Sequence, residues 1–334
     1  MRFKTHIVKR KLLSEIRSFL LDNQNYLKSN NLFNSALGEW AWIHSTKTKR
    51  YVTSIAEDHK VLSDFLKEPL QQSCAYGLIT PVETYENLSK IQSNSFLSDI
   101  GIIENIEGES SITFLRQSIF LKNEYSRFCK RYKCYSDSPR HLFFANQICQ
   151  LTDTSKVGIE IGGGYGGLIY YLVKKDYSGK LINCDLLESI LISYMYLNLN
   201  GVETKLCVTN EQLSSAYLSQ AKVILITPNL FSDLETYIPI GFVFNSRSLS
   251  EMSQVQVDDY LRAVNSSLKP QFFISENAEE VIFPDSVRHI EITQSSISER
   301  LSNYSLVRRY RSKFAGGSNR YGTRVYERLT DLEF

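Results

Sequence analysis

The chain has 334 residues, of which 43% are hydrophobic and 22% are charged, a balance typical of a folded globular protein. This composition excludes a disordered chain, a collagen or a coiled coil as the main state. Its 38 basic and 36 acidic residues give a net charge of +2, so charge gives no reason to expect nucleic acid as the main partner. No run approaches the roughly 20 apolar residues that a membrane-spanning helix needs.

The first segment of the chain is basic and helical in pattern. Residues 1–13 carry several positive charges, but no apolar signal-peptide core follows them, so we expect a cytoplasmic protein. Apolar residues recur with a helical period over residues 7–20, which predicts a helix that packs on its own protein. A peripheral membrane contact through Lys9, Arg10 and Lys11 is the alternative.

Two regions are predicted. Residues 1–137 read as a mainly helical region, which we expect to contribute to an acceptor site or an oligomer contact. Residues 138–334 read as an α/β domain that opens with a helix, in which Ser138 is expected to be the cap and Pro139 the first helical residue. The six cysteines include no Cys-x-x-Cys pair and the five histidines are scattered, so we expect no required metal.

Beyond residue 150, short apolar runs alternate with stretches of helix length. The runs that we expect to be buried strands are Val157–Ile161, Leu181–Cys184, Val223–Ile226, Phe242–Phe244 and Phe272–Ile274. Continuous apolar strands separated by helices predict a doubly wound parallel sheet covered on both faces. The last two runs, Tyr304–Arg309 and Thr323–Leu329, are joined by a Gly-Gly loop and predict an antiparallel hairpin.

The most informative segment is a cluster of glycines between the first strand and the next helix. Six of the 16 glycines fall between residues 158 and 167. Gly162, Gly164 and Gly167 satisfy the G-x-G-x-x-G pattern of dinucleotide-binding loops. Glu160, Gly162, Gly164 and Gly166 satisfy the acidic-x-G-x-G-x-G pattern of class I methyltransferases that use S-adenosylmethionine (SAM). The glycines alone do not decide between the two cofactors.

Two carboxylates bear on this choice. Glu160, at the end of the first strand, suits a cationic ligand such as SAM and would repel a pyrophosphate. Asp185, directly after the second strand, is placed to accept hydrogen bonds from the hydroxyls of an adenosine ribose. The alternative for Asp185 is to cap the helix predicted over residues 188–199.

Four segments together resemble a known family. They are Glu160–Gly167 (EIGGGYGG), Asp185–Glu188 (DLLE), Phe244–Met252 (FNSRSLSEM) and Ser275–Asn277 (SEN). Over roughly residues 138–330 the chain resembles the sugar O-methyltransferases, a group of class I SAM-dependent enzymes. The resemblance implies a Rossmann-like sheet of order 3-2-1-4-5-7-6 with an antiparallel last strand. It also implies SAM as cofactor and methyl transfer to a hydroxyl of a sugar, sugar nucleotide or glycan.

The resemblance also implies which residues contact the cofactor. Those in and around the glycine loop are Glu160, Gly162, Gly163, Gly164, Tyr165 and Gly166, with Asp185 on the ribose. On the adenine side, either Val208–Asn210 or Ile226–Asn229 ends the third strand. The longer apolar run favours the latter, and hence Asn229. Asn245, after the fourth strand, is expected near the methionine end of SAM.

Methyl transfer to a hydroxyl needs close positioning and benefits from a general base. Glu251 is our first candidate for the base, with a structural pairing to Arg247 as its alternative. His141 is the second candidate, with a satisfied structural histidine as its alternative. Arg247 is expected to bind an anionic acceptor group. Glu276 and Asn277 are expected either to bind acceptor hydroxyls or to cap a turn.

Two further functions stay open at this stage. An NAD-dependent oxidoreductase would use the G-x-G-x-x-G pattern, and a non-catalytic binding protein would keep the cofactor fold without the chemistry. A homo-oligomer is compatible with all three readings.

Overall fold

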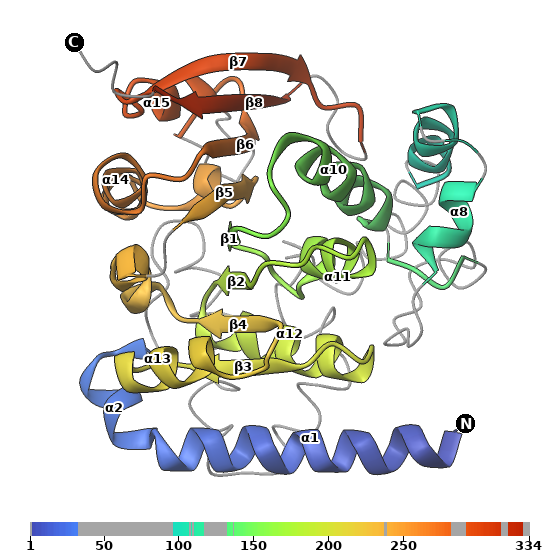
Figure 1. The fold of residues 1–334 in the computed structure, drawn as a ribbon, viewed down its shortest axis with the longest axis vertical. Coiled ribbons are helices and arrows are strands. Elements are labelled where there is room, and N and C mark those ends of the chain that lie inside the picture. Colours follow the sequence, from blue (N-terminus) through green and yellow to red (C-terminus); the bar gives the residue numbers. More distant parts are fainter. Residues whose placement is uncertain are drawn as a thin grey trace.

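A computed structural model describes residues 2–32, 96–106, 108, 110–116, 132–135, 137–236, 239–281, 292–314 and 320–329. One eight-stranded sheet forms its centre, in the order β3-β4-β2-β1-β5-β6-β8-β7 (Figure 1). The strands are β1 (Val157–Ile161), β2 (Leu181–Cys184), β3 (Thr204–Cys207), β4 (Val223–Ile226), β5 (Ile240–Ser246), β6 (Phe272–Ala278), β7 (Tyr304–Arg311) and β8 (Tyr321–Arg328). Strands β1 to β6 are parallel, whereas β8 runs antiparallel to both β6 and β7.

The predicted strand order is confirmed, with one addition. β4-β2-β1-β5-β6-β8-β7 follows the order 3-2-1-4-5-7-6, including the antiparallel hairpin at its end. The addition is β3, which pairs with β4 at the far edge and was not predicted as a strand. Its sequence, TKLC, is short and carries the exposed Lys205, so no continuous apolar run marks it. β4 pairs directly with β2, which confirms the choice of the longer run for that position.

Strands β5 and β6 extend further than their apolar runs. The apolar run predicted over Phe272–Ile274 continues through Ala278, so Ser275–Asn277 form the last part of β6. The cause is long-range pairing, since β8 continues alongside β6 and places Asn277 opposite Gly322. As a result, successive side chains of this segment point to opposite faces of the sheet.

Helices cover both faces of the sheet (Figure 1). On one face lie α10 (Ser138–Leu151), α11 (Gly167–Lys174) and α12 (Leu187–Leu199). On the other lie α13 (Asn210–Leu218), α14 (Gln254–Ala263) and α15 (Gln294–Ser298). Short helical turns η3 (Pro228–Leu230), η4 (Ser232–Thr236), η5 (Leu249–Glu251) and η6 (Val264–Leu268) complete the connections. Phe242 and Phe244 of β5 enter the first core and Val243 enters the second, as the period of a strand requires.

The N-terminal helix packs against the sheet domain. α1 (Arg2–Asp22) runs beneath the β3 edge and contacts α12, and α2 (Gln24–Ser29) follows it (Figure 1). Leu12, Ile16 and Leu20 are buried in the first core, so the predicted packing of this segment on its own protein is confirmed. A helix over residues 96–106 and α8 (Ser110–Leu115) are also described. The helices predicted elsewhere between residues 33 and 95 lie outside the described residues.

Two further sequence expectations can be compared with the structure. The prediction that Ser138 caps α10 is wrong, because the helix begins at Ser138 and Asp137 is the N-cap. Ser138 instead accepts a hydrogen bond from the backbone N–H of Tyr135 at 3.0 Å. Among the helices described here, none is both long enough and apolar enough to cross a bilayer.

Candidate cofactor and acceptor site

The glycine loop joins β1 to α11 at the carboxyl ends of the parallel strands. Gly162, Gly164 and Gly166 have φ values of +70°, +56° and +86°, a backbone region that favours glycine. Gly166 is the N-cap of α11, and its N–H is bonded to the carbonyl of Gly163 at 2.9 Å. Gly162 leaves no room for a side chain, because a Cβ there would overlap the hydroxyl of Ser248. The glycine pattern therefore reflects both conformation and close packing.

Beneath this loop lie two buried oxygen acceptors. A Cβ on Gly163 would lie 2.6 Å from Asn183 Oδ1 and 2.7 Å from Glu160 Oε2, so both atoms face the same point of the backbone. Neither oxygen has a hydrogen-bond donor within the described part of the chain. The Asn183 amide group donates instead to Ser193 Oγ at 3.1 Å. Unsatisfied buried acceptors are rare, so a donor or a positive charge at this loop would be stabilised.

The two carboxyl groups flanking the loop have raised pKa values. Burial, with a smaller contribution from the negative charge of Asp185, raises the pKa of Glu160 to about 8. Burial also raises the pKa of Asp185 to about 7, against hydrogen bonds that favour its charged form. Its two oxygens accept from the N–H groups of Gly164 and Leu186, each at 2.7 Å. The N-cap of α12 is Leu186 and not Asp185, so the helix-capping alternative for Asp185 is wrong.

This set of groups fits a cationic ligand that carries hydroxyls. Glu160 and Asn183 supply acceptors without donors. The Asp185 carboxyl lies at the next strand end, where Ser189 also forms a hydrogen bond with it. A bound cation would favour the charged forms of both carboxyl groups and lower their raised pKa values, whereas a pyrophosphate would raise those values further. This set of oxygen acceptors therefore fits SAM better than a dinucleotide.

The third glycine of the dinucleotide pattern has a packing explanation. A Cβ on Gly167 would lie 2.5 Å from the hydroxyl of Tyr165 and would overlap Nδ1 of His141. These two polar atoms are 3.2 Å apart. The absence of a side chain at Gly167 thus accommodates the His141–Tyr165 pair, and the G-x-G-x-x-G match needs no ligand to explain it.

Asn229 lies in η3 after β4, where its side chain is exposed. Its Nδ2 is 3.4 Å from the hydroxyl of Tyr26 in α2 and 3.3 Å from the carbonyl of Val208 after β3. Asn23 accepts a 2.7 Å hydrogen bond from Gln212, also at this edge. The N-terminal helices therefore reach the side of the site where Asn229 lies, a contact that no local sequence pattern predicts.

Asn245 joins three elements at the carboxyl edge. Its side chain is fully buried, and Nδ2 donates to the carbonyl of Ile161 at 2.9 Å and to Ser248 Oγ at 2.5 Å. Its Oδ1 accepts from the N–H of Leu249 at 3.3 Å and from Asn277 Nδ2 at 2.8 Å. These bonds occupy both ends of the amide. The geometry thus favours a role for Asn245 in holding the glycine loop over a direct cofactor contact.

Asn277 is buried in the same network. Its Oδ1 accepts from the backbone N–H and the hydroxyl of Ser250, each at 3.2 Å, and its Nδ2 also donates to Ser275 Oγ at 2.8 Å. Because it accepts from the η5 backbone, the geometry favours the turn-capping alternative for Asn277 over contact with an acceptor hydroxyl.

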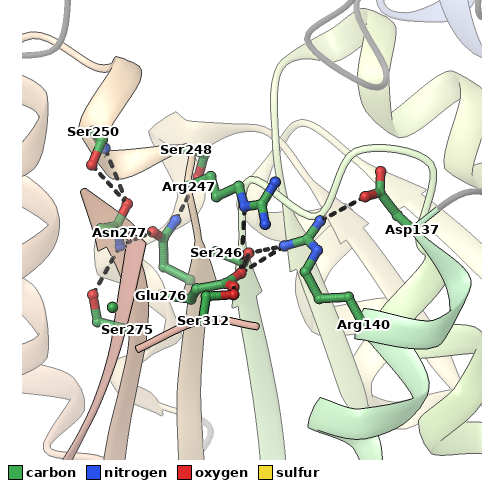
Figure 2. Close-up of polar contacts among 12 residues, drawn as sticks. Asp137, Arg140, Ser246, Arg247, Ser248, Ser250, Ser275, Glu276, Asn277 and Ser312 are labelled. Atoms are coloured by element: carbon green, nitrogen blue, oxygen red, sulfur yellow. Dashed lines mark hydrogen bonds and ion pairs between the residues drawn. The ribbon is translucent and has the colours of Figure 1, made fainter. Parts of the chain in front are cut away.

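Glu276 points to the opposite face, into a charged cluster (Figure 2). Its Oε2 is 2.8 Å from Arg140 Nη1, 2.6 Å from Ser246 Oγ and 3.6 Å from Arg247 Nε, and its Oε1 accepts from Ser312 at 2.5 Å. Burial would raise the pKa of this carboxyl, but Arg247, Arg140 and the two hydroxyls outweigh burial and lower it to about 2. Glu276 is therefore a permanent anion that orients the arginines, and it is fully buried.

Arg140 and Asp137 are members of this cluster that the sequence does not mark as site residues. Arg140 belongs to α10 and also pairs with Asp137 at 3.5 Å. The Asp-x-x-Arg spacing at a helix start signals that local pair. Nothing local signals the partner 136 residues further along the chain.

The two base candidates lie in different surroundings. His141 is buried, and burial together with the charge of Arg140 lowers its pKa to about 3, so its imidazole is neutral and weakly basic. Glu251 ends η5 and is half-buried. Arg247 has its Nε 3.6 Å from Oε2 of Glu276, a partner that its sequence position does not signal.

No group of three or more His, Cys, Asp and Glu residues suited to a metal occurs among the residues described. The adjacent carboxylates Asp258 and Asp259 form ion pairs with arginines: Asp258 lies 2.5 Å from Arg300, and Asp259 lies 2.9 Å from Arg262.

Comparisons with known proteins give matches among solved structures alone. No family model and no curated protein matches the chain. The methyltransferase domain of bacterial CtHen1-C is 12% identical, with a TM-score of 0.43, over 58% of this chain and 99% of that one. The glycopeptide N-methyltransferase MtfA complexed with SAM is 12% identical, with a TM-score of 0.36, over 57% and 87%. The pyocyanin biosynthetic protein PhzM is 14% identical, with a TM-score of 0.37, over 68% and 64%.

Proposed function

We propose that this protein is a SAM-dependent O-methyltransferase that acts on a hydroxyl of a sugar or glycan. The observation that carries the proposal is the acceptor-lined glycine loop at the carboxyl edge of β1 and β2. There, Glu160 and Asn183 present buried oxygens without donors, and Asp185 lies at the next strand end. A cationic ligand with a ribose satisfies this arrangement, and a dinucleotide pyrophosphate does not. The sugar acceptor rests on the resemblance of the FNSRSLSEM and SEN segments.

SAM, when bound, supplies an activated methyl group, so the chain's own task is to position the acceptor oxygen and remove its proton. Glu251 is the proposed base, because it is a half-buried carboxylate at the carboxyl edge of β5, where an open α/β sheet binds its ligands. His141 is the weaker candidate, since its lowered pKa makes the neutral imidazole a poor proton acceptor.

The proposed base is tested by methyl transfer to a panel of free sugars and nucleotide sugars, with the demethylated product S-adenosylhomocysteine (SAH) as the readout. Glu251→Gln should lower kcat by about 10²–10⁴-fold while SAH affinity stays unchanged. His141→Asn should retain more activity than Glu251→Gln. Glu203→Gln, at an exposed carboxylate before β3, is the matched control.

The opposite ranking would assign the proton transfer to His141. Undiminished kcat in both variants would refute both bases. SAH binding without methyl transfer to any sugar of the panel would favour another acceptor or the non-catalytic alternative.

A further inference from the structure

Two arginines from distant parts of the chain share one carboxylate at the carboxyl edge of the sheet. Arg140 comes from α10 and Arg247 from the end of β5, and both lie near Oε2 of Glu276, at 2.8 and 3.6 Å. Figure 2 shows the two guanidinium groups on the same side of Glu276. Like charges repel each other, and the carboxylates of Glu276 and Asp137 supply the negative charge that offsets this repulsion.

Both guanidinium groups are held in place. Arg140 is fixed by Glu276, by the Ser246 hydroxyl and by Asp137. The Arg247 guanidinium lies over the ring of Tyr321, 4.7 Å from its centre. The backbone of Arg247 has φ +67°, a left-handed conformation that costs energy in a residue other than glycine. Such strain clusters at functional sites, where the surrounding structure maintains it.

The two arginine side chains differ in exposure. The Arg247 side chain is 21% exposed, and that of Arg140 is 9% exposed. Asp137 lies 3.5 Å from Arg140, and against the effect of burial the charges of both arginines lower the pKa of Asp137, so Asp137 and Glu276 together balance the charge of the two arginines. The buried Nε of Arg140 has no hydrogen-bond partner among the described residues. An oxyanion between the two groups would receive charge-assisted hydrogen bonds in a partly buried place.

We propose that Arg140 and Arg247 form an anion-binding subsite for the acceptor, which therefore carries a carboxylate or a phosphate group. The inference rests on the proposed function for the sugar part of the acceptor. Glu276 is a positioning residue in this account, because it holds both arginines and is itself fully buried. Two kinds of acceptor fit this subsite, a uronic acid and a sugar phosphate. Both carry an oxyanion, planar in the first and tetrahedral in the second, next to a sugar ring.

The experiment is isothermal titration of the full chain, saturated with SAH, with three probes: D-glucuronate, glucose 1-phosphate and glucose. At least one anionic sugar should bind at least about tenfold more tightly than glucose, with the preference weakening as salt rises. The tighter of the two anions identifies the source of the charge. Arg247→Gln should abolish the preference, and Arg247→Lys should retain part of it because it keeps the charge without the planar fork. Arg262→Gln, at an exposed arginine of α14, should leave it unchanged.

The SAH titration that precedes the sugars separates the two proposals. Failure of SAH to bind would refute the proposed cofactor, and the sugar titrations on the SAH-free chain would still decide the subsite. Equal binding of all three sugars would overturn the anion subsite. An anion preference that survives in Arg247→Gln would overturn it equally, provided that the variant keeps the SAH affinity of the wild type.

Discussion

Removing the charge of Glu276 should destabilise the protein strongly. In Glu276→Gln the side chain keeps its size, but two arginines lose their common counterion, at 2.8 and 3.6 Å, and the Ser246 and Ser312 hydroxyls lose a charged acceptor. Breaking a buried ion pair on one side costs about 3–5 kcal/mol, because the remaining charge is left buried. We expect the free energy of unfolding in urea at pH 7, followed by circular dichroism, to fall by that amount.

The matched control is Asp259→Asn. Asp259 pairs with Arg262 on the surface at 2.9 Å, and both side chains are more than half exposed. Exposed pairs contribute about 0–1 kcal/mol, so this variant should unfold almost like the wild type. A loss below about 1 kcal/mol in Glu276→Gln would refute the reasoning, because it would mean that the cluster is hydrated or that the arginines have other counterions.

The effect should also depend on pH, with a sign set by the lowered pKa. Glu276 has a pKa of about 2 in the folded protein against an ordinary value of 4.5. Its contribution to stability is therefore complete above pH about 4.5 and is lost as the pH falls through about 2. The difference in unfolding free energy between wild type and Glu276→Gln should shrink over that window.

Three further outcomes are expected. Gly163→Ala should lower the free energy of unfolding by about 1–3 kcal/mol and weaken SAH binding, because its Cβ would lie 2.6 Å from Asn183 Oδ1. The control Gly101→Ala, at a glycine with open space around it, should not destabilise the protein. Equal urea midpoints for the two variants would contradict this. Asp185→Ala should weaken SAH binding by about 1.5–3 kcal/mol in calorimetry, and an unchanged affinity would remove Asp185 from the site. Because the folded pKa of Glu160 is raised from 4.5 to about 8, its contribution to stability is complete below pH 4.5 and is lost as pH rises toward 8. Glu160→Gln should therefore flatten the pH dependence of unfolding between pH 5 and 8, and a slope equal to that of the wild type would exclude a protonated Glu160.

The sequence predicts those elements of the fold that are marked by a local pattern of apolar residues or by a turn. The apolar runs of β1, β2 and β4 and the hairpin of β7 and β8 were recognised because their burial is continuous or their turn carries Gly-Gly. The edge strand β3 escaped because its pattern is polar and short. The extension of β6 through Asn277 escaped because it depends on pairing with β8, a long-range effect.

The site divides in the same way. The positive φ values of Gly162, Gly164 and Gly166 agree with a loop built for close approach, which glycine density alone indicates. The environment of Glu276 depends on Arg140, which lies 136 residues away and meets it through tertiary packing. The position of Glu276 at the carboxyl edge of the sheet follows from the sequence, but the two arginines at its Oε2 and the Ser312 hydroxyl at its Oε1 depend on tertiary packing.

The central claim is the cofactor, and calorimetry of the full chain with SAH and NAD tests it most directly. We predict that SAH binds with a Kd in the micromolar range, on the order of −8 kcal/mol, and that Glu160→Gln and Asp185→Ala change that affinity. NAD should bind at least about a hundredfold more weakly. Tighter binding of NAD than of SAH, or no binding of SAH at all, would contradict the account.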